Sequence, residues 1–432
     1  MVFFTADVRI EHSKEKKEID MAILALDSYG KDDKGYLFQT NYKRVELDKV
    51  ALNDPMRELA NKLTSCNQTN YETGFNAVLY YNSKTNEYTV AFEGSAFPSF
   101  GKSSEITTAS KIAPSFDFDM NSKEYVVNAL GLEMRIPQDM WNDWGKNNAL
   151  QAAGRIASQF QMAKEIADIL NASPELKNLN INFTGHSLGG ALASVAGLST
   201  GKPTFTYNSE GVSDKILENF GLLDKKNNRD YNITAYHTDN DILTNTQKWA
   251  QGEGKKPMTD VIAEETGKLS IDNALSQLKQ LGYDTKTAKT LTGVIFDGTG
   301  ADFNVFAKAI DSNNERNDLV PTAIGDEKNV GDFNSSTDKL IAGAVGVVAG
   351  GIHLYISKGK DLDTTYGIVK KAAELTDGAL AHRMEPFVKN MMLRNVVEQN
   401  LWDRFNKEKQ SMDREISNTE MRSLEQIYIV TD

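Results

Sequence analysis

The sequence predicts an α/β fold in which helices cover a central, mostly parallel β-sheet. Between residues 147 and 243, a helical periodicity, a β-rich run, a turn between two glycines, a second helix and two further β-rich runs follow one another. Strands that alternate with helices in this way usually pair in parallel, because each helix returns the chain to the same edge of the sheet. An earlier pair of β-rich runs predicts a hairpin.

The composition indicates a globular chain with a substantial core. Its 432 residues are 40% hydrophobic and 25% charged, enough for one large domain with insertions or for two domains. The formal net charge of -12 repels nucleic acid unless a local basic patch overrides it, so nucleic acid is not an expected partner. Cys66 is the single cysteine, which excludes an intrachain disulfide and a Cys/His metal cluster. We expect neither a metal nor a cofactor.

The first secondary-structure elements follow from periodicity. "EIDMAILALDSYG" spaces its apolar residues as a helix does, and Gly30 is a plausible end for that helix. The stretch "GFNAVLYYNSKTNEYTVAFEGS" has two β-rich runs, at 75–81 and 88–93, separated by turn-forming residues, which predicts a hairpin. Residues 96–130 have scattered aromatics and no clear period, as in an excursion from the core.

The later elements alternate between helix and strand. "NNALQAAGRIASQFQMAKEIADILNAS" places its apolar residues on one helical face and leads into "LNINFTG", a strand. "GALASVAGL" predicts a helix of small residues, and "KPTFTYNSEGV" and "YNITAYHTDNDIL" predict two more strands. The expected catalytic core is therefore 1–249 with 336–390. It is interrupted by the excursion at 96–130 and by a helical and loop insertion at 250–335, and 391–432 form a helical tail.

Residues 340–356, "LIAGAVGVVAGGIHLYI" after Lys339, form a nearly uncharged run at the lower end of the length that spans a bilayer. We expect a buried Gly/Ala-rich core helix or strand pair, and a membrane-inserting segment is the alternative.

The N-terminus lacks a basic region followed by an apolar one, so a cleavable signal peptide is not expected. The chain is then either cytoplasmic or secreted by a route that reads no such peptide.

Ser187 lies between Gly185 and Gly189, at the junction of a predicted strand and a predicted helix. A sharp strand-to-helix turn strains its central residue, and the positions two residues away must be small. Such a turn exposes the serine hydroxyl and aims the N-terminus of the next helix at it, which favours a developing oxyanion. The motif predicts a nucleophilic serine.

"FTGHSLGGALAS" resembles the nucleophile elbow of the fungal-type (class 3) lipases, an α/β-hydrolase family with bacterial phospholipase members. "ILALDSY", the hairpin region and "TFTYNSEG" extend the resemblance over residues 20 to about 245. It implies an α/β-hydrolase fold, with Ser187 as nucleophile and the backbone N–H of Leu188 as one oxyanion donor. It also implies that Ser95, in "FEGS", is the second donor. Glu93 departs from the Arg that the family often has there.

The acid and the base are chosen partly through the same resemblance. "AYHTDNDILT" resembles the acid loop of the family and favours Asp241, with Asp239 as the alternative. His382, in "LAHRMEPFVKN", resembles the "H-x-[LM]-E-x-[YF]" pattern of phospholipase-like members and is the favoured base. His353, in "GGIHLYISKG", is the alternative base. His186 is expected to pack beneath the elbow.

These residues predict a serine-dependent hydrolase of carboxylic esters. The resemblance implies that the esters are those of lipids and that the activity is that of a phospholipase A or a lipase. The resemblance implies that 96–130 form a lid, for which an ordinary packed loop is the alternative. The expected substrate is lipid or phospholipid at a membrane or aggregate, and an inhibitory or immunity protein is a further candidate partner. Secretion without a cleavable signal peptide agrees with this activity. The alternative functions are a soluble-ester or thioester hydrolase and a catalytically inactive, lipid-binding or membrane-inserting toxin-like protein.

Overall fold

The structure is a computed structural model of the chain. It describes residues 2–30, 35–51, 54–68, 73–94, 99–102, 115–119, 124–129, 132–137, 158–251, 321–332, 339, 342–343, 366–367, 370, 373, 377 and 380–393. Residues 20–387 form one compact unit, and residues 1–19 group with those from 388 onward in a second.

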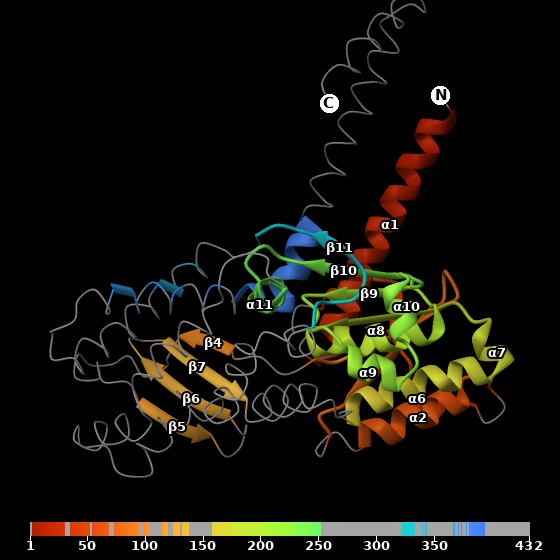
Figure 1. Ribbon diagram of the computed structural model, residues 1–432, viewed down its shortest axis with the longest axis horizontal. Helices are drawn as coiled ribbons and strands as arrows, with labels where there is room; N and C mark the ends of the chain where they lie inside the picture. The colour runs from red at the N-terminus through yellow and green to blue at the C-terminus, as the bar shows by residue number, and fades with distance from the viewer. Residues whose placement is uncertain are drawn as a thin grey trace, which may run out of the picture. The chain divides into compact units, whose positions relative to one another are not determined.

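The larger unit contains a seven-stranded sheet whose strands run in the order β1-β2-β3-β8-β9-β10-β11. Figure 1 labels β9, β10 and β11 of this sheet. The strands are β1 (Tyr42–Arg44), β2 (Ala77–Asn82), β3 (Glu87–Phe92), β8 (Ile181–His186), β9 (Thr204–Tyr207), β10 (Ile233–His237) and β11 (Asp326–Asn329). The pairs from β3 to β11 are parallel, and β1 and β2 add antiparallel strands at one edge. The predicted α/β class with a mostly parallel sheet is confirmed.

The predicted hairpin is β2 and β3, which pair antiparallel from Ala77 opposite Phe92 to Asn82 opposite Glu87. Both strands are largely buried, and polar residues form the turn between them. Strand β3 then pairs with β8 in parallel, with Phe92 opposite Gly185. The residues that follow β3 therefore emerge beside the turn that follows β8.

The helices have the bounds α1 (Val2–Asp27), α2 (Arg57–Gln68), α6 (Ser158–Ala172), α7 (Pro174–Lys177), α8 (Leu188–Thr200), α9 (Asp214–Asn219), α10 (Leu223–Asn227) and α11 (Ile242–Ala250). Two short 3-10 helices are η1 (Tyr36–Gln39) and η2 (Leu47–Lys49), and residues 384–393 are helical. The predicted helices before and after the elbow correspond to α6 and α8. Helix α6 begins at Ser158 within the described residues.

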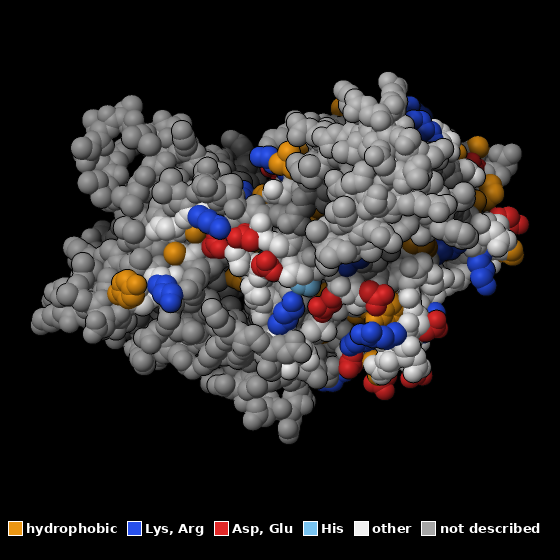
Figure 2. All heavy atoms as spheres, turned by 90° about the horizontal axis from the view of Figure 1, so that it is seen from above, with side chains coloured by type: hydrophobic (Ala, Val, Ile, Leu, Met, Phe, Trp, Pro, Cys, Tyr) orange, Lys and Arg blue, Asp and Glu red, His pale blue; other side chains and the backbone are white. Residues whose placement is uncertain are grey.

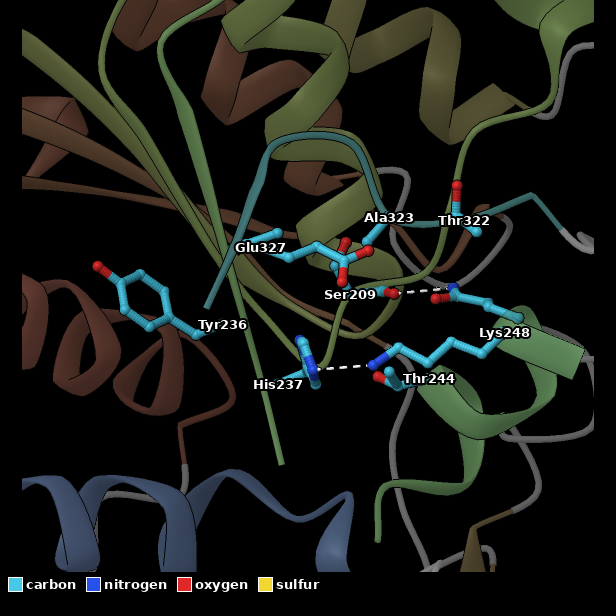
Figure 3. A pocket seen from close by; sticks show the side chains of 10 residues that line it. Ser209, Tyr236, His237, Thr244, Lys248, Thr322, Ala323 and Glu327 are labelled. Carbon is cyan, nitrogen blue, oxygen red and sulfur yellow. Dashed lines mark hydrogen bonds between the residues drawn. The ribbon is translucent and has the colours of Figure 1, made fainter. Parts of the chain in front are cut away.

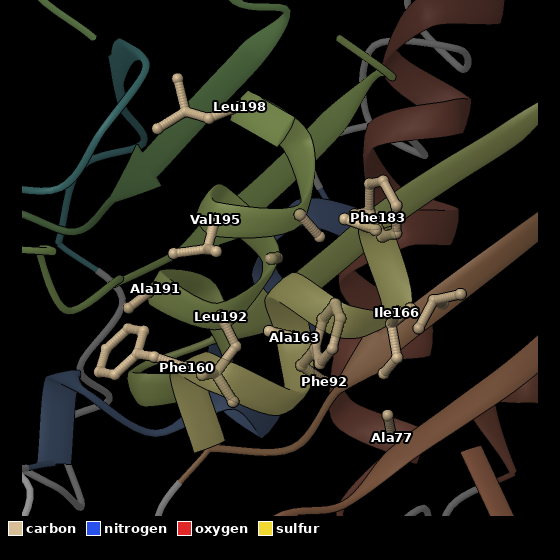
Figure 4. Packing of buried hydrophobic residues seen from close by; sticks show 14 of the residues in the cluster. Ala77, Phe92, Phe160, Ala163, Ile166, Phe183, Ala191, Leu192, Val195 and Leu198 are labelled. Carbon is tan, nitrogen blue, oxygen red and sulfur yellow. The ribbon is translucent and has the colours of Figure 1, made fainter. Parts of the chain in front are cut away.

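The core lies where α6 and α8 cover the sheet. Figure 4 shows Phe160, Ala163 and Ile166 of α6 gathered with Leu192 and Val195 of α8, and all five side chains are buried. Helix α8 is buried from Leu188 to Leu198 because small residues let its backbone approach the strands. A Cβ at Gly197 would lie 2.3 Å from Oγ1 of Thr204 on β9. This close packing holds the first turn of α8 in a fixed place above the sheet.

A second, four-stranded antiparallel sheet has the order β4-β7-β6-β5 (Figure 1). Its strands are β4 (Ser99–Lys102), β5 (Ser115–Asp119), β6 (Glu124–Ala129) and β7 (Leu132–Pro137). Three of them fall within 96–130, where the sequence has no clear period, because strands of four to six residues are too short for a reliable alternation. The lid role of this segment stays a prediction.

The other domain boundaries also stay predictions. Strand β11 lies inside the expected insertion at 250–335 and pairs in parallel with β10, so part of this range belongs to the sheet. Most of the remaining insertion falls outside the described residues, as do the 391–432 tail beyond residue 393 and the 340–356 run apart from 342–343. Among the helices that the structure describes, none combines the length and the hydrophobicity needed to cross a membrane.

On the face shown in Figure 2, the described Lys and Arg side chains lie interspersed with Asp and Glu side chains. Neither sign therefore dominates the described part of this face.

Candidate active site

The turn between β8 and α8 consists of Ser187 alone. Strand β8 ends at His186, α8 begins at Leu188, and Ser187 has φ 56° and ψ -128°, a conformation that L-residues rarely adopt. The structure confirms the strained turn that the sequence predicts. Ser187 therefore belongs neither to the buried strand nor to the buried helix.

The glycines around Ser187 are required by close backbone contacts. A Cβ at Gly185 would lie 2.1 Å from the carbonyl oxygen of Gly189, and one at Gly189 would lie 2.2 Å from that of Phe92. A Cβ at Gly94 would lie 2.3 Å from the carbonyl oxygen of His186. The end of β3 therefore runs directly against the elbow, at the point where the chain continues to Ser95.

Three loops bring Ser187, Asp241 and His382 together. The Ser187 hydroxyl lies 2.9 Å from Nε2 of His382, and Nδ1 of His382 is hydrogen-bonded to Oδ1 of Asp241. All three residues are at least 98% buried. The solvent-exposed Ser187 hydroxyl that the sequence predicts is therefore wrong, because the hydroxyl is turned onto His382. Because the carboxylate accepts a hydrogen bond from Nδ1–H, Nε2 of the neutral ring is left as the acceptor for the serine hydroxyl. This is the hydrogen-bond order in which an imidazole can withdraw a proton from a serine.

Asp241 is held as a carboxylate by its neighbours. It precedes α11, and the backbone N–H of Thr244 donates to its Oδ2 at 2.6 Å. Burial opposes its ionisation, but His382 and the bonds from His382 and Thr244 outweigh burial and lower its pKa below the usual value. An ionised, fully buried carboxylate beside an imidazole is suited to stabilising the imidazolium form.

A second layer of polar groups lies behind these three. Nε2 of His186 is 2.6 Å from the backbone carbonyl oxygen of His382, and its Nδ1 is 2.8 Å from the hydroxyl of Tyr29. Asn208, directly after β9, donates from Nδ2 to the carbonyl oxygen of Ala381 at 3.2 Å. The sequence indicated a packed His186, but it carried no signal for Tyr29 or Asn208, which reach the site from distant parts of the chain.

The remaining residues that the sequence singled out lie in different places. Leu188 is the first residue of α8 and is buried next to Ser187. Asp239 is bonded elsewhere, since its Oδ1 accepts a hydrogen bond from Asn329 at 2.5 Å. Ser95 and His353 lie outside the described residues. Glu93 accepts a hydrogen bond from Asn76 at 2.5 Å.

A small pocket lies beside the acid loop, between β10, α11 and residues 322–327 (Figure 3). His237 and Lys248 face each other across it, and Nζ of Lys248 donates to Nε2 of His237 at 3.1 Å. Burial and then Lys248 lower the pKa of His237. None of Ser187, Asp241 and His382 lines this pocket. Within the described ranges, no group of three His, Cys, Asp or Glu residues is arranged to hold a metal ion.

A central, mostly parallel sheet with flanking helices and a strained serine at a strand-to-helix turn defines an α/β-hydrolase-like protein. Residues 20–297 match the Tle-like phospholipase domain family, and the chain belongs to this phospholipase-like family. The narrower assignment to the fungal-type class 3 lipases stays a prediction.

The chain is also similar to the extracellular phospholipase A1 of Serratia liquefaciens, with 34% identity over 131 residues. The matched region covers 30% of this chain and 38% of that protein's length.

Proposed function

We propose that this protein hydrolyses carboxylic ester bonds of phospholipids, with Ser187 as nucleophile, His382 as general base and Asp241 as the acid that orients it. The observation that carries the proposal is the 2.9 Å contact between Ser187 Oγ and His382 Nε2, with the opposite ring nitrogen bonded to buried Asp241. Membership of a phospholipase-like family and the similarity to a phospholipase A1 support a lipid ester as substrate.

The reaction proceeds in two halves. Ser187 Oγ attacks the ester carbonyl while its proton passes to Nε2 of His382, and the imidazolium then protonates the leaving lysophospholipid oxygen. Water, deprotonated by the same histidine, attacks the acyl-serine and releases a fatty acid. Asp241 stabilises the imidazolium in both halves, for which its lowered pKa is favourable.

The developing oxyanion needs donors beside Ser187. The N–H of Leu188 stands at the N-terminus of α8, where the helix dipole also favours negative charge. Ser95 is the second proposed donor, and Gly94 supports this because it brings the chain against the elbow immediately before Ser95. Neither donor requires a metal or a cofactor.

We further propose that the protein is secreted and acts at membranes outside the cell that makes it. The similar Serratia phospholipase A1 is described as extracellular, which supports secretion. A lid role for 96–130, which would open against a lipid surface, and an inhibitory or immunity partner belong to the same proposal.

The test is incubation of wild-type protein and Ser187→Ala with vesicles of mixed phosphatidylcholine, phosphatidylethanolamine and phosphatidylglycerol, followed by mass spectrometry of the lipids. We expect wild type alone to release free fatty acid and lysophospholipid in equal amounts. Hydrolysis of soluble esters without lysophospholipid would overturn the lipid substrate. Vesicle binding with no turnover of any ester would indicate a catalytically inactive lipid-binding protein instead.

A further inference from the structure

The base is the member of the site that is most remote in sequence. His382 follows Ser187 by 195 positions and Asp241 by 141, and it occupies a short turn between helical residues. A histidine in a turn depends on its own backbone being held in place, because a displacement of about 1 Å at a catalytic group costs on the order of 10² in rate. The position of His382 therefore depends on the contacts that the backbone of this turn makes.

The carbonyl of His382 is bound by the residue that precedes the nucleophile. His186 Nε2 lies 2.6 Å from this oxygen, and since a carbonyl can only accept, Nε2 carries the proton. The other ring nitrogen, Nδ1, then accepts from the Tyr29 hydroxyl at 2.8 Å. Tyr29 thus selects the tautomer of His186 that donates to His382. The rings of His186 and His382 lie 4.7 Å apart between centroids. His186, the residue next to the nucleophile, is therefore in direct contact with the base.

The carbonyl of the preceding residue is bound from another strand. Asn208 donates from Nδ2 to Ala381 O at 3.2 Å, and its Oδ1 accepts from the backbone N–H of Thr238 at 3.0 Å. Thr238 begins the loop that carries Asp241. Asn208 is fully buried and has φ 41°, a strained value that these two hydrogen bonds help to maintain. One amide therefore joins the acid loop to the base loop.

We propose that His186 and Asn208 are positioning residues that hold His382 against Ser187 and Asp241 by binding the two successive backbone carbonyls of Ala381 and His382. The inference rests on the proposed function, because it assigns His382 as the base. Neither side chain needs to touch substrate, since each acts on the main chain of the base. His186 ties the base to the nucleophile elbow, and Asn208 ties it to the acid loop.

The test measures how fast a fluorophosphonate labels Ser187, together with ester turnover, in four variants. His186→Leu removes the donor, whereas His186→Gln retains an amide N–H at nearly the same reach. Asn208→Asp keeps the acceptor for Thr238 but places an oxygen against the carbonyl of Ala381. Asn67→Asp is the matched control, because Asn67 also bridges two backbone groups, the N–H and C=O of Ala77, away from the site.

We expect His186→Leu and Asn208→Asp to lower the labelling rate and kcat by about 10²-fold, with KM little changed. His186→Gln should recover most of the loss, and Asn67→Asp should label as wild type does.

Wild-type labelling rates and wild-type kcat in folded His186→Leu and Asn208→Asp would overturn the inference. So would an equal loss in Asn67→Asp, which would indicate a general effect of stability. Labelling needs no lipid, so a labelled wild type that hydrolyses no phospholipid would overturn the proposed substrate alone. A wild type that is not labelled at Ser187 would overturn both proposals.

Discussion

The nucleophile elbow and the loop that carries His382 reach the same site in opposite ways. The elbow is contiguous: Gly185, Ser187 and Gly189 lie within five residues, and backbone contacts of these residues require its shape. The His382 loop is held by partners at the ends of β8, β9 and β10, each more than 130 positions away. One half of the site is therefore set by local sterics and the other half by long-range hydrogen bonds.

Each half of the site is vulnerable to a different kind of substitution. Added volume damages the elbow, because a Cβ at Gly189 meets a backbone carbonyl that has no room to move. Loss of a donor damages the His382 loop, because the buried carbonyl of His382 would lose its bond from His186, and that of Ala381 would keep only the longer bond from Thr238 Oγ1 at 3.4 Å. The following predictions separate these two kinds of damage, beginning with the largest effect.

Removal of the nucleophile should have the largest effect. Ser187→Ala should lower turnover of a p-nitrophenyl ester by about 10⁶-fold without unfolding the chain, as expected when a triad nucleophile is lost. Ser199→Ala, at the far end of the same helix, is the control and should retain wild-type turnover. More than a few per cent of activity in Ser187→Ala would contradict the assignment.

Loss of the acid's charge comes next. Asp241→Asn should lower kcat by about 10⁴-fold, because an amide stabilises the imidazolium poorly and favours the wrong histidine tautomer. Asp239→Asn should change kcat only a few-fold, since Asp239 bonds to Asn329 and not to His382. If steady-state kinetics gave the reverse ranking, Asp239 would be the acid.

Crowding of the elbow should be visible in stability. Gly189→Ala should lower the free energy of unfolding by about 3 kcal/mol, because its Cβ would lie 2.2 Å from the carbonyl oxygen of Phe92. Gly343→Ala meets nothing within 4 Å and should be neutral or stabilising by less than about 1 kcal/mol. Urea denaturation measures the stability of both variants. Equal midpoints for Gly189→Ala and Gly343→Ala would contradict the proposed steric clash at Gly189.

The smallest expected effect is the loss of stability at low pH that His186 causes. Burial, and then the charge of His382, lower the pKa of His186 to about 3. The unfolded residue binds a proton below about pH 6.5, while the folded one stays neutral until about pH 3, so stability falls as pH decreases through this window. Between pH 6 and 5 the loss from His186 should be about 1 kcal/mol.

His186→Gln removes this titration while retaining a donor. Its free energy of unfolding, measured by urea denaturation at each pH, should therefore fall less steeply than that of wild type between pH 6 and 5. Parallel curves for the two proteins would show that His186 does not titrate as proposed.

Local features of the molecule could be predicted from the sequence. Alternation and helical spacing predicted the hairpin β2–β3, the helices α6 and α8 and the parallel strands between them, since these patterns report burial on one face. The strained turn at Ser187 was predictable because it depends on residues within two positions. The edge strand β11 was not, because "DEKN" is exposed and carries no apolar pattern.

Distant features of the site needed the structure. Asp241 and His382 were favoured mainly through resemblance to a family, and the structure brings them into hydrogen-bond contact with each other. Tyr29 and Asn208 could not be predicted, because a tyrosine 157 positions from His186 gives no local signal of the bond between them. The catalytic roles of all these residues stay predictions.

The choice of base tests the account most directly, through kcat/KM for a p-nitrophenyl ester in His382→Ala and His353→Ala. The base serves both acylation and deacylation, so His382→Ala should lose nearly as much activity as Ser187→Ala, about 10⁶-fold. His353→Ala should stay within a few-fold of wild type. An inactive, folded His353→Ala beside a nearly normal His382→Ala would contradict the account and assign the base to His353.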